Sequence, residues 1–452
     1  MRTLRHSKWH RSQSAFDGRR PLRIVLDEAL DKDEASELLR DFGSNENLEV
    51  WSTASEDRVR HIELEPYDHE SDFVGYRVGN TRSGVRFAGQ FVRFAQDMEE
   101  EGLASYDAAH RMLLLAQIAR KLGADVLATR APLLLETAPR GLVKEANPMT
   151  PEEGVAVMGL YLRLVGDFTV LQGSEGGVYR VNRGLWYWVL TRDLLASGWR
   201  WFSACVMSST ATGDDRLTFL GEAVLGRFDR VLRARDHILQ QSLLPANNDT
   251  GDEAIFYLDV TLLMLVGALD AAARVVHLTY RLGEDPSDAG WRKAKWRKSL
   301  FAADGAFEDL LAEESRARDV IDLIALLRNT IHGAGLQGIS VSDGGDLNSR
   351  ENLVWLPAED RDRLLAIMRR RGGHTGWGLR PLFNEEVALE PDRFIERLIP
   401  AAAQVLNALM DATDVGRLAG VDGAALSSTP PDPPREFAPG LARVHRLLAG
   451  LS

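Results

Sequence analysis

The stretch that most constrains this chain runs from Arg318 to Leu336 and reads RDVIDLIALLRNTIHGAGL. Its apolar residues recur at three- and four-residue steps, which is the spacing of one buried helical face. These residues are Val320, Ile321, Ile324, Leu327 and Ile331. Gly333 and Gly335 follow and suit a helix C-terminus, where a left-handed residue is needed. The stretch therefore predicts a helix that is buried along one side and ends near Gly333.

Arg328 and His332 are four residues apart, so they lie one turn apart on the same side of this helix, with about 5–6 Å between their Cβ atoms. An imidazole can move a proton near neutral pH, and a guanidinium can hold a phosphate with forked hydrogen bonds. Such a pair could cleave RNA without a metal ion, with the His acting on the 2′-hydroxyl and the Arg fixing the scissile phosphate. The alternative is a His bound to a backbone carbonyl at a helix end and an Arg in a surface ion pair.

The segment LRNTIHG around this pair resembles the signature of HEPN domains, which are small helical bundles. Their motif is Arg, a polar residue that is commonly Asn, a short spacer and His. The resemblance covers roughly residues 250–340 and implies a catalytic role for Arg328, Asn329 and His332. It also implies RNA as the partner, a homodimer with a composite RNase site, no cofactor at that site, and a role in bacterial defence, toxin or stress systems.

Composition sets the limits for these interpretations. The 452 residues are enough for two or three domains, and 45% hydrophobic with 27% charged residues is typical of globular proteins. A net charge of −12 requires any nucleic-acid contact to come from local basic patches. The single cysteine, Cys205, excludes an internal disulfide framework and fits a cytoplasmic protein. We expect no membrane partner, because no run approaches the ~18 apolar residues of a spanning helix.

Residues 1–20 are basic and without periodicity, which predicts a flexible arm. Residues 21–140 then alternate between strand and helix patterns. The apolar run LRIVL ends at Asp27, DKDEASELLRDFG predicts a capped helix, and LEVWST predicts a second strand. From residue 105 to 136 the pattern predicts a long helix, a strand and another helix. This alternation favours an α/β domain with a parallel sheet.

This N-terminal arrangement resembles a PIN-type nuclease domain. Asp27 stands at the end of the first strand and Asp107 opens the long helix, where that family carries metal-binding acids. The resemblance implies a Mg²⁺ or Mn²⁺ site, but an octahedral site needs several converging carboxylates. A merely similar α/β domain without a metal is therefore kept as an alternative.

Residues 141–250 read as a helical region, and the polar segment 243–253 predicts a loop at a domain boundary. The most apolar helix is predicted over residues 254–280, with Asp270 on its apolar face. A buried carboxylate needs a cationic partner, and Arg274 lies one turn away. Alternatively, Asp270 orients Arg328 or His332 from the facing helix, so we include Asp270 among the catalytic candidates.

The strongest basic patch is WRKAKWRKSL, over residues 291–300. Cations bind phosphates and indoles stack on bases, so its residues are candidates for RNA binding. They are Trp291, Arg292, Lys293, Lys295, Trp296, Arg297 and Lys298. The alternative is a partly solvated helix whose indoles are buried.

After the motif, residues 338–357 predict a β-hairpin with its turn at 343–346, and residues 359–371 and 391–413 predict helices. The predicted fold is α+β: an α/β domain at 21–140, a helical region at 141–250 and a HEPN-like helical domain at 251–425, followed at 426–452 by a proline-rich linker and a short helix. The leading function is RNA binding or metal-independent RNA cleavage. The alternatives are a non-catalytic helical sensor or interaction module and, more weakly, a metal-dependent PIN-like nuclease.

Overall fold

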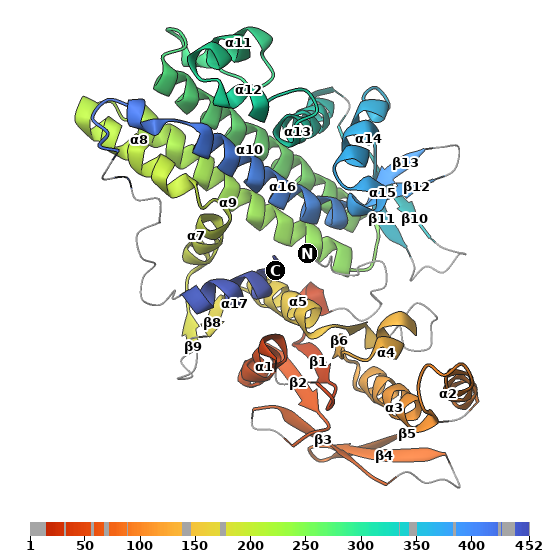
Figure 1. The fold of residues 1–452 in the computed structure, drawn as a ribbon. Coiled ribbons are helices and arrows are strands. Elements are labelled where there is room, and N and C mark those ends of the chain that lie inside the picture. Colours follow the sequence, from red (N-terminus) through yellow and green to blue (C-terminus); the bar gives the residue numbers. More distant parts are fainter. Residues whose placement is uncertain are drawn as a thin grey trace.

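A computed structural model of the chain shows an α+β protein, with a mixed sheet at its N-terminal end and a helical bundle beyond it (Figure 1). The structure describes residues 15–30, 33–55, 58–66, 72–87, 89–137, 146–171, 178–333, 335–342, 350–382, 386–423, 426 and 439–451.

The N-terminal sheet has the strand order β5-β4-β3-β2-β1-β6-β7. Its strands are β1 (Leu22–Leu26), β2 (Leu48–Ser52), β3 (Arg60–Leu64), β4 (Phe73–Val78), β5 (Thr81–Arg86), β6 (Val126–Ala128) and β7 (Pro148–Met149). The neighbouring strands β3, β2, β1, β6 and β7 pair in parallel, as predicted. Strands β3, β4 and β5 form an antiparallel meander. The expectation of a purely parallel sheet is therefore wrong. Only eight residues separate β3 from β4 and two separate β4 from β5, which is too few for the crossover that parallel pairing needs.

Helices cover both faces of this sheet. On one face lie α2 (Gln90–Glu100) and α3 (Tyr106–Leu122), which close a core around Val25 and Trp51. On the other face lie α1 (Glu34–Asp41) and α5 (Pro151–Leu164). The apolar core on this second face continues without a break into the helical bundle, so α5 joins the sheet to the rest of the molecule.

The predicted helices at this end form for local reasons. The Ser105 side chain accepts a hydrogen bond from the Ala108 backbone N–H, and Gly123 ends α3 at a φ of 65°, a conformation that a glycine adopts without strain. Thr150 and Glu153 form a capping box at the start of α5. Of the arm predicted to be flexible, Ala15 and Phe16 are buried against the protein, whereas residues 17–19 are exposed. Residues 1–14 lie outside the described residues.

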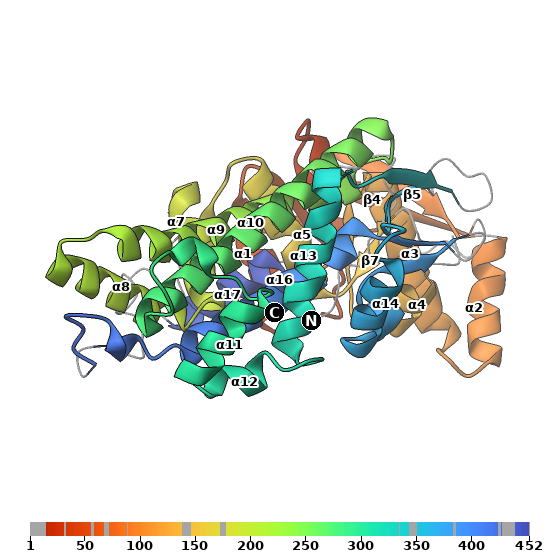
Figure 2. The same cartoon turned by 90° about the horizontal axis from the view of Figure 1, so that it is seen from above.

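The bundle is built around two long neighbouring helices, α9 (Arg216–Leu243) and α10 (Asn248–Tyr280), with α13 (Arg316–Gly333) and α16 (Pro391–Ala412) packed against α10 (Figure 2). The remaining helices of this part are α7 (Arg183–Leu194), α8 (Gly198–Thr212), α11 (Ala294–Ala303), α12 (Ala306–Leu310), α14 (Arg361–Arg370) and α15 (Gly373–Gly376). Helix α10 is long and apolar enough to cross a membrane by length and composition. In the structure its apolar side chains contribute to the bundle core.

The polar segment 243–253 was predicted to be a loop, but α10 already begins at Asn248. The reason is a second capping box: the Asn247 side chain accepts from the Thr250 N–H, and the Thr250 hydroxyl accepts from the Asn247 N–H. These reciprocal bonds satisfy the first backbone donors of the helix, so polar residues that are typical of a loop form its first turns.

A second sheet lies beside the C-terminal end of α13, with strand order β10-β11-β13-β12. Its strands are β10 (Gly338–Val341), β11 (Glu351–Trp355), β12 (Leu379–Pro381) and β13 (Val387–Leu389). The predicted hairpin is confirmed in the antiparallel pairing of β10 with β11, whereas its predicted turn at 343–346 lies outside the described residues. A small pair, β8 (Thr169–Leu171) with β9 (Val178–Arg180), precedes α7.

The C-terminal helix α17 (Pro439–Ala449) packs against α5 between the first sheet and the bundle (Figure 1). Two buried arginines cap its end: Arg163 of α5 donates to the Leu448 carbonyl, and Arg235 of α9 to the Ala449 carbonyl, each at 2.7 Å. Arg163 also forms a two-pronged ion pair with the buried Asp236 of α9, at 2.6 and 3.0 Å. One buried charge network thus links the sheet, the bundle and the chain end.

Candidate functional site

Helix α13 is buried along its first half and open at its end. Leu323, Ile324 and Leu327 lie in the bundle core, whereas Asn329 and His332 are exposed and Arg328 is half-buried. One Arg328 Nη1–H donates to the Asn329 side-chain oxygen at 3.3 Å. The structure thus places the three motif residues at the exposed end of one helix, where a ligand can reach them.

Asp270 was predicted to be buried, and this is wrong: its side chain is exposed on α10. Its neighbours Leu269 and Ala271 are buried, but Asp270 lies on the stripe of α10 that faces solvent. Partial desolvation raises the pKa of Asp270, and four positive charges oppose that rise, those of Arg274, Arg328, Arg227 and Lys293. The structure therefore brings Asp270 and Arg328 into the same electrostatic environment, together with cations of α9 and of the segment before α11.

We expect Asp270→Asn to change the free energy of unfolding by less than about 0.5 kcal/mol, because an exposed side chain contributes little to the core. The same variant should bind polyanions more tightly, since it removes the negative charge among four cations. Urea denaturation and RNA-binding titrations measure both effects. The half-buried Asp259 lies on the same helix, and Asp259→Asn serves as the matched control. A loss above about 2 kcal/mol in Asp270→Asn would show that its carboxylate is paired in the folded state.

A pocket of about 660 Å³ opens beside the exposed end of α13. The helix end contributes Asn329 and Thr330, β11 contributes Trp355, and the start of α14 contributes Arg361. Three acidic residues, Glu359, Asp360 and Glu386, also line it. An aromatic ring beside hydrogen-bonding groups suits a planar polar group such as a nucleobase. The sequence pattern did not indicate this pocket, because its wall comes from three separate segments.

The basic segment 291–300 is divided by the fold. Arg292, Lys293, Lys295 and Lys298 are exposed, and Arg297 is half-buried. The two indoles are in the core: Trp291 Nε1–H donates to the Leu269 carbonyl at 2.7 Å, and Trp296 Nε1–H donates to His277 Nδ1 at 3.2 Å. Neither ring is free to stack on a base. The segment therefore has the alternative arrangement, in which both indoles are buried and most of the cationic side chains are exposed to solvent.

The predicted metal-binding acids lie in different environments. Asp27 is buried at the end of β1, where it accepts from the Thr129 hydroxyl at 2.7 Å and from the Ala29 N–H at 3.0 Å. Asp107 is exposed at the start of α3. Among the described residues, no group of three or more His, Cys, Asp or Glu side chains is placed to hold a metal ion.

The strand order nevertheless gives Asp27 a notable position. The chain winds away from β1 in both directions, through β2 on one side and β6 on the other. In such sheets, ligands bind outside the carboxyl ends of the strands where the winding reverses. Asp27 follows β1, and Thr129 follows β6. The next residue, Arg130, forms an ion pair with Glu152 in the first turn of α5, at 2.8 Å. Only the tertiary structure brings these residues to one edge.

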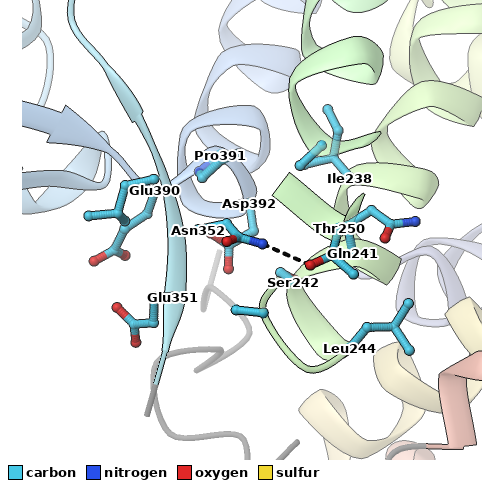
Figure 3. A pocket seen from close by; sticks show the side chains of 13 residues that line it. Ile238, Gln241, Ser242, Leu244, Thr250, Glu351, Asn352, Glu390, Pro391 and Asp392 are labelled. Carbon is cyan, nitrogen blue, oxygen red and sulfur yellow. Dashed lines mark hydrogen bonds between the residues drawn. The ribbon is translucent and has the colours of Figure 1, made fainter. Parts of the chain in front are cut away.

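A second pocket lies where the loop between α9 and α10 meets β11 and the start of α16 (Figure 3). Its free space is about 30 Å³, which is room for about one water molecule. The Asn352 side-chain amide donates across it to the Thr250 hydroxyl at 2.9 Å. Glu351 and Glu390 on its wall pair with Arg380 and Arg393. This pocket is a polar junction between elements.

Comparisons with known proteins found no match to this chain among family models, curated proteins or solved structures.

Proposed function

We propose that the exposed end of α13 binds RNA and cleaves it without a metal ion, in a bacterial defence, toxin or stress role. The observation that supports this proposal is that Arg328, Asn329 and His332 are accessible at one helix end beside a pocket of about 660 Å³. The role in the cell rests on the HEPN resemblance alone.

In the proposed reaction, His332 takes the proton of a 2′-hydroxyl. The 2′-oxygen then attacks the adjacent phosphorus, a 2′,3′-cyclic phosphate forms, and the bond to the 5′-oxygen breaks. The Arg328 guanidinium holds the phosphate and offsets its growing negative charge. The leaving 5′-oxygen needs a proton, and a second His332 from another copy of the chain can supply it.

This need for a second proton-transfer group leads to a homodimer through the helical part. Helix α10 exposes Phe256 and Leu263, two turns apart on the same stripe as Asp270. Contact between two copies along this stripe would cover its apolar part and bring the two α13 ends toward each other. A two-fold axis doubles the catalytic residues without new ones.

We expect sedimentation at micromolar protein to show a dimer, and Phe256→Glu/Leu263→Glu to shift it to monomer because charges replace the buried apolar contact. The exposed Leu103 of the N-terminal region, changed in Leu103→Glu, is the control that should stay dimeric. A wild-type protein that sediments only as a monomer would contradict both the dimer and the composite site.

The competing proposal is a non-catalytic sensor or interaction module, in which the pocket binds a partner and His332 transfers no proton. Incubation of labelled RNA with the purified protein in EDTA separates the two. Cleavage in EDTA supports the α13 site. Cleavage only with Mg²⁺ or Mn²⁺ supports a metal site at the edge of the N-terminal sheet, and no cleavage under either condition supports the interaction module.

A further inference from the structure

We propose that an arginine cluster on the first half of α13, outside the motif, is a binding site for a phosphate group. Asp322 of α13 is paired with three arginines from separate segments. Arg292 Nε lies 3.1 Å from one carboxylate oxygen, and Arg318 Nε and Arg363 Nη2 lie 3.2 and 2.8 Å from the other. Arg297 adds a fourth guanidinium nearby, whose charge acts on Arg318.

The cluster carries more positive than negative charge. Three guanidinium groups pair with the one carboxylate, and the charge of a fourth, Arg297, acts on Arg318, in a chain whose net charge is −12. Burial lowers the pKa of Arg318, Asp322 opposes this, and the charges of Arg297 and Arg363 lower it further. Among the described residues, two buried atoms of this region have no hydrogen-bond partner, the donor Arg297 Nε and the acceptor Asp322 Oδ1. A bound oxyanion would relieve the repulsion among these guanidinium groups.

The cluster is held in place by the core beneath it. The Trp291 indole is anchored to the Leu269 carbonyl of α10, and the Trp291 carbonyl accepts from Arg318 Nη1 at 3.0 Å. Arg318 is largely buried, but the side chains of Arg292 and Arg363 are 35% and 50% exposed. The guanidinium groups of Arg292 and Arg363 can each donate two hydrogen bonds, they reach solvent, and the buried Arg318 and Trp291 hold the cluster in place. This arrangement suits a phosphate better than isolated lysines do.

Two more arginines lie near this cluster, and two carboxylates balance their charge, because Glu314 pairs with Arg370 in addition to Asp319. Asp319 lies nearly one turn before Asp322 and pairs with Arg370 and Arg371 of the α14 end, each at 2.7 Å. Asn329 lies seven residues after Asp322, on the same face of the helix and about 10 Å further along its axis. A strand of RNA whose backbone binds the cluster could therefore reach the pocket at the helix end.

The phosphate can come from an RNA backbone or from a free phosphorylated molecule, and only the RNA source rests on the function proposed above. Arg292→Gln/Arg363→Gln removes the two exposed arginines. Arg58→Gln/Arg216→Gln removes two exposed, ion-paired arginines elsewhere and is the control with the same change in net charge. Inorganic phosphate in melting experiments and 2′-O-methyl RNA in anisotropy titrations are the two probes.

For an RNA source, we expect the cluster variant to bind the RNA at least about 10-fold more weakly than the control. The slope of the logarithm of the binding constant against the logarithm of the salt concentration should also be shallower, by roughly 0.7 for each lost phosphate contact. The melting temperature of the cluster variant without added phosphate, compared with that of the control, shows whether α13 and its neighbours still fold. For a free ligand, phosphate should raise the melting temperature of wild type and control but not of the cluster variant, whether or not RNA binds.

The proposal is wrong if cluster variant and control respond equally to both probes. If the double variant does not fold, the single change Arg363→Gln, at the more exposed of the two positions, decides between the same outcomes. Suppose that the wild-type protein does not cut RNA, but that the cluster variant binds phosphate or RNA more weakly than the control does. That result would support the phosphate site and contradict only the proposed nuclease activity.

Discussion

His332→Ala is expected to lower metal-independent RNA cleavage by about 10²–10⁴-fold, because it removes the group proposed to move the proton. The fold should persist, since the side chain is exposed in the last turn of α13 and is no part of the core. Single-turnover cleavage of labelled RNA in EDTA measures the rate, and thermal melting measures the fold.

Two further variants make this result specific. His61→Ala removes another exposed histidine, on β3, and should cut RNA at the wild-type rate. Arg328→Ala should weaken both binding and cleavage because it removes a phosphate contact, whereas His332→Ala should affect mainly cleavage. If wild type and His332→Ala cut equally well, the site lies elsewhere, and Asp27 and Asp107 are the next residues to change.

Asp236→Asn is expected to destabilise the protein by about 3–5 kcal/mol, the cost of leaving a buried ion-pair partner without its counter-charge. Asp236 is buried, it pairs with Arg163, and it accepts from the Tyr187 hydroxyl at 2.7 Å. Losing this anchor should also loosen the end of α17, which Arg163 caps. Urea denaturation gives the free energy, and proteolysis near the C-terminus reports on α17.

Asp229→Asn is the control for this prediction, because Asp229 lies on the same helix in a partly exposed pair with Arg233 at 2.7 Å. Its loss should cost no more than about 1 kcal/mol of the free energy of unfolding.

Burial raises the pKa of Asp236, but the charges of Arg163 and Arg235 outweigh this and hold that pKa below its usual value. A carboxylate with a lowered pKa in the folded state stabilises above the unfolded pKa of about 3.9 and loses this effect as the pH falls through the folded value. Asp236→Asn should therefore lose part of the acid sensitivity of wild type, and equal stability of the two aspartate variants would contradict the role of the network.

The sequence alone determined the local elements. The strand before Asp27, the helix between Ser105 and Gly123 and the helix that begins at Thr150 are where their patterns predict them. The hairpin after the motif and the exposed end of α13 could also be predicted. Caps, glycine ends and apolar periodicity depend on residues within a few positions of each other, so they can be read without knowing what they pack against.

Tertiary structure decided everything that depends on a distant partner. The apolar surroundings of Asp270 in the sequence did not reveal that its side of α10 faces solvent, and the Trp-rich segment did not reveal that both indoles turn inward. The antiparallel meander, the capping of α17 by two buried arginines and the arginine cluster around Asp322 arise from segments far apart in the chain. Which face of a helix is buried, and which charges meet, is set by the elements that pack on it, and this information is not contained in the local pattern.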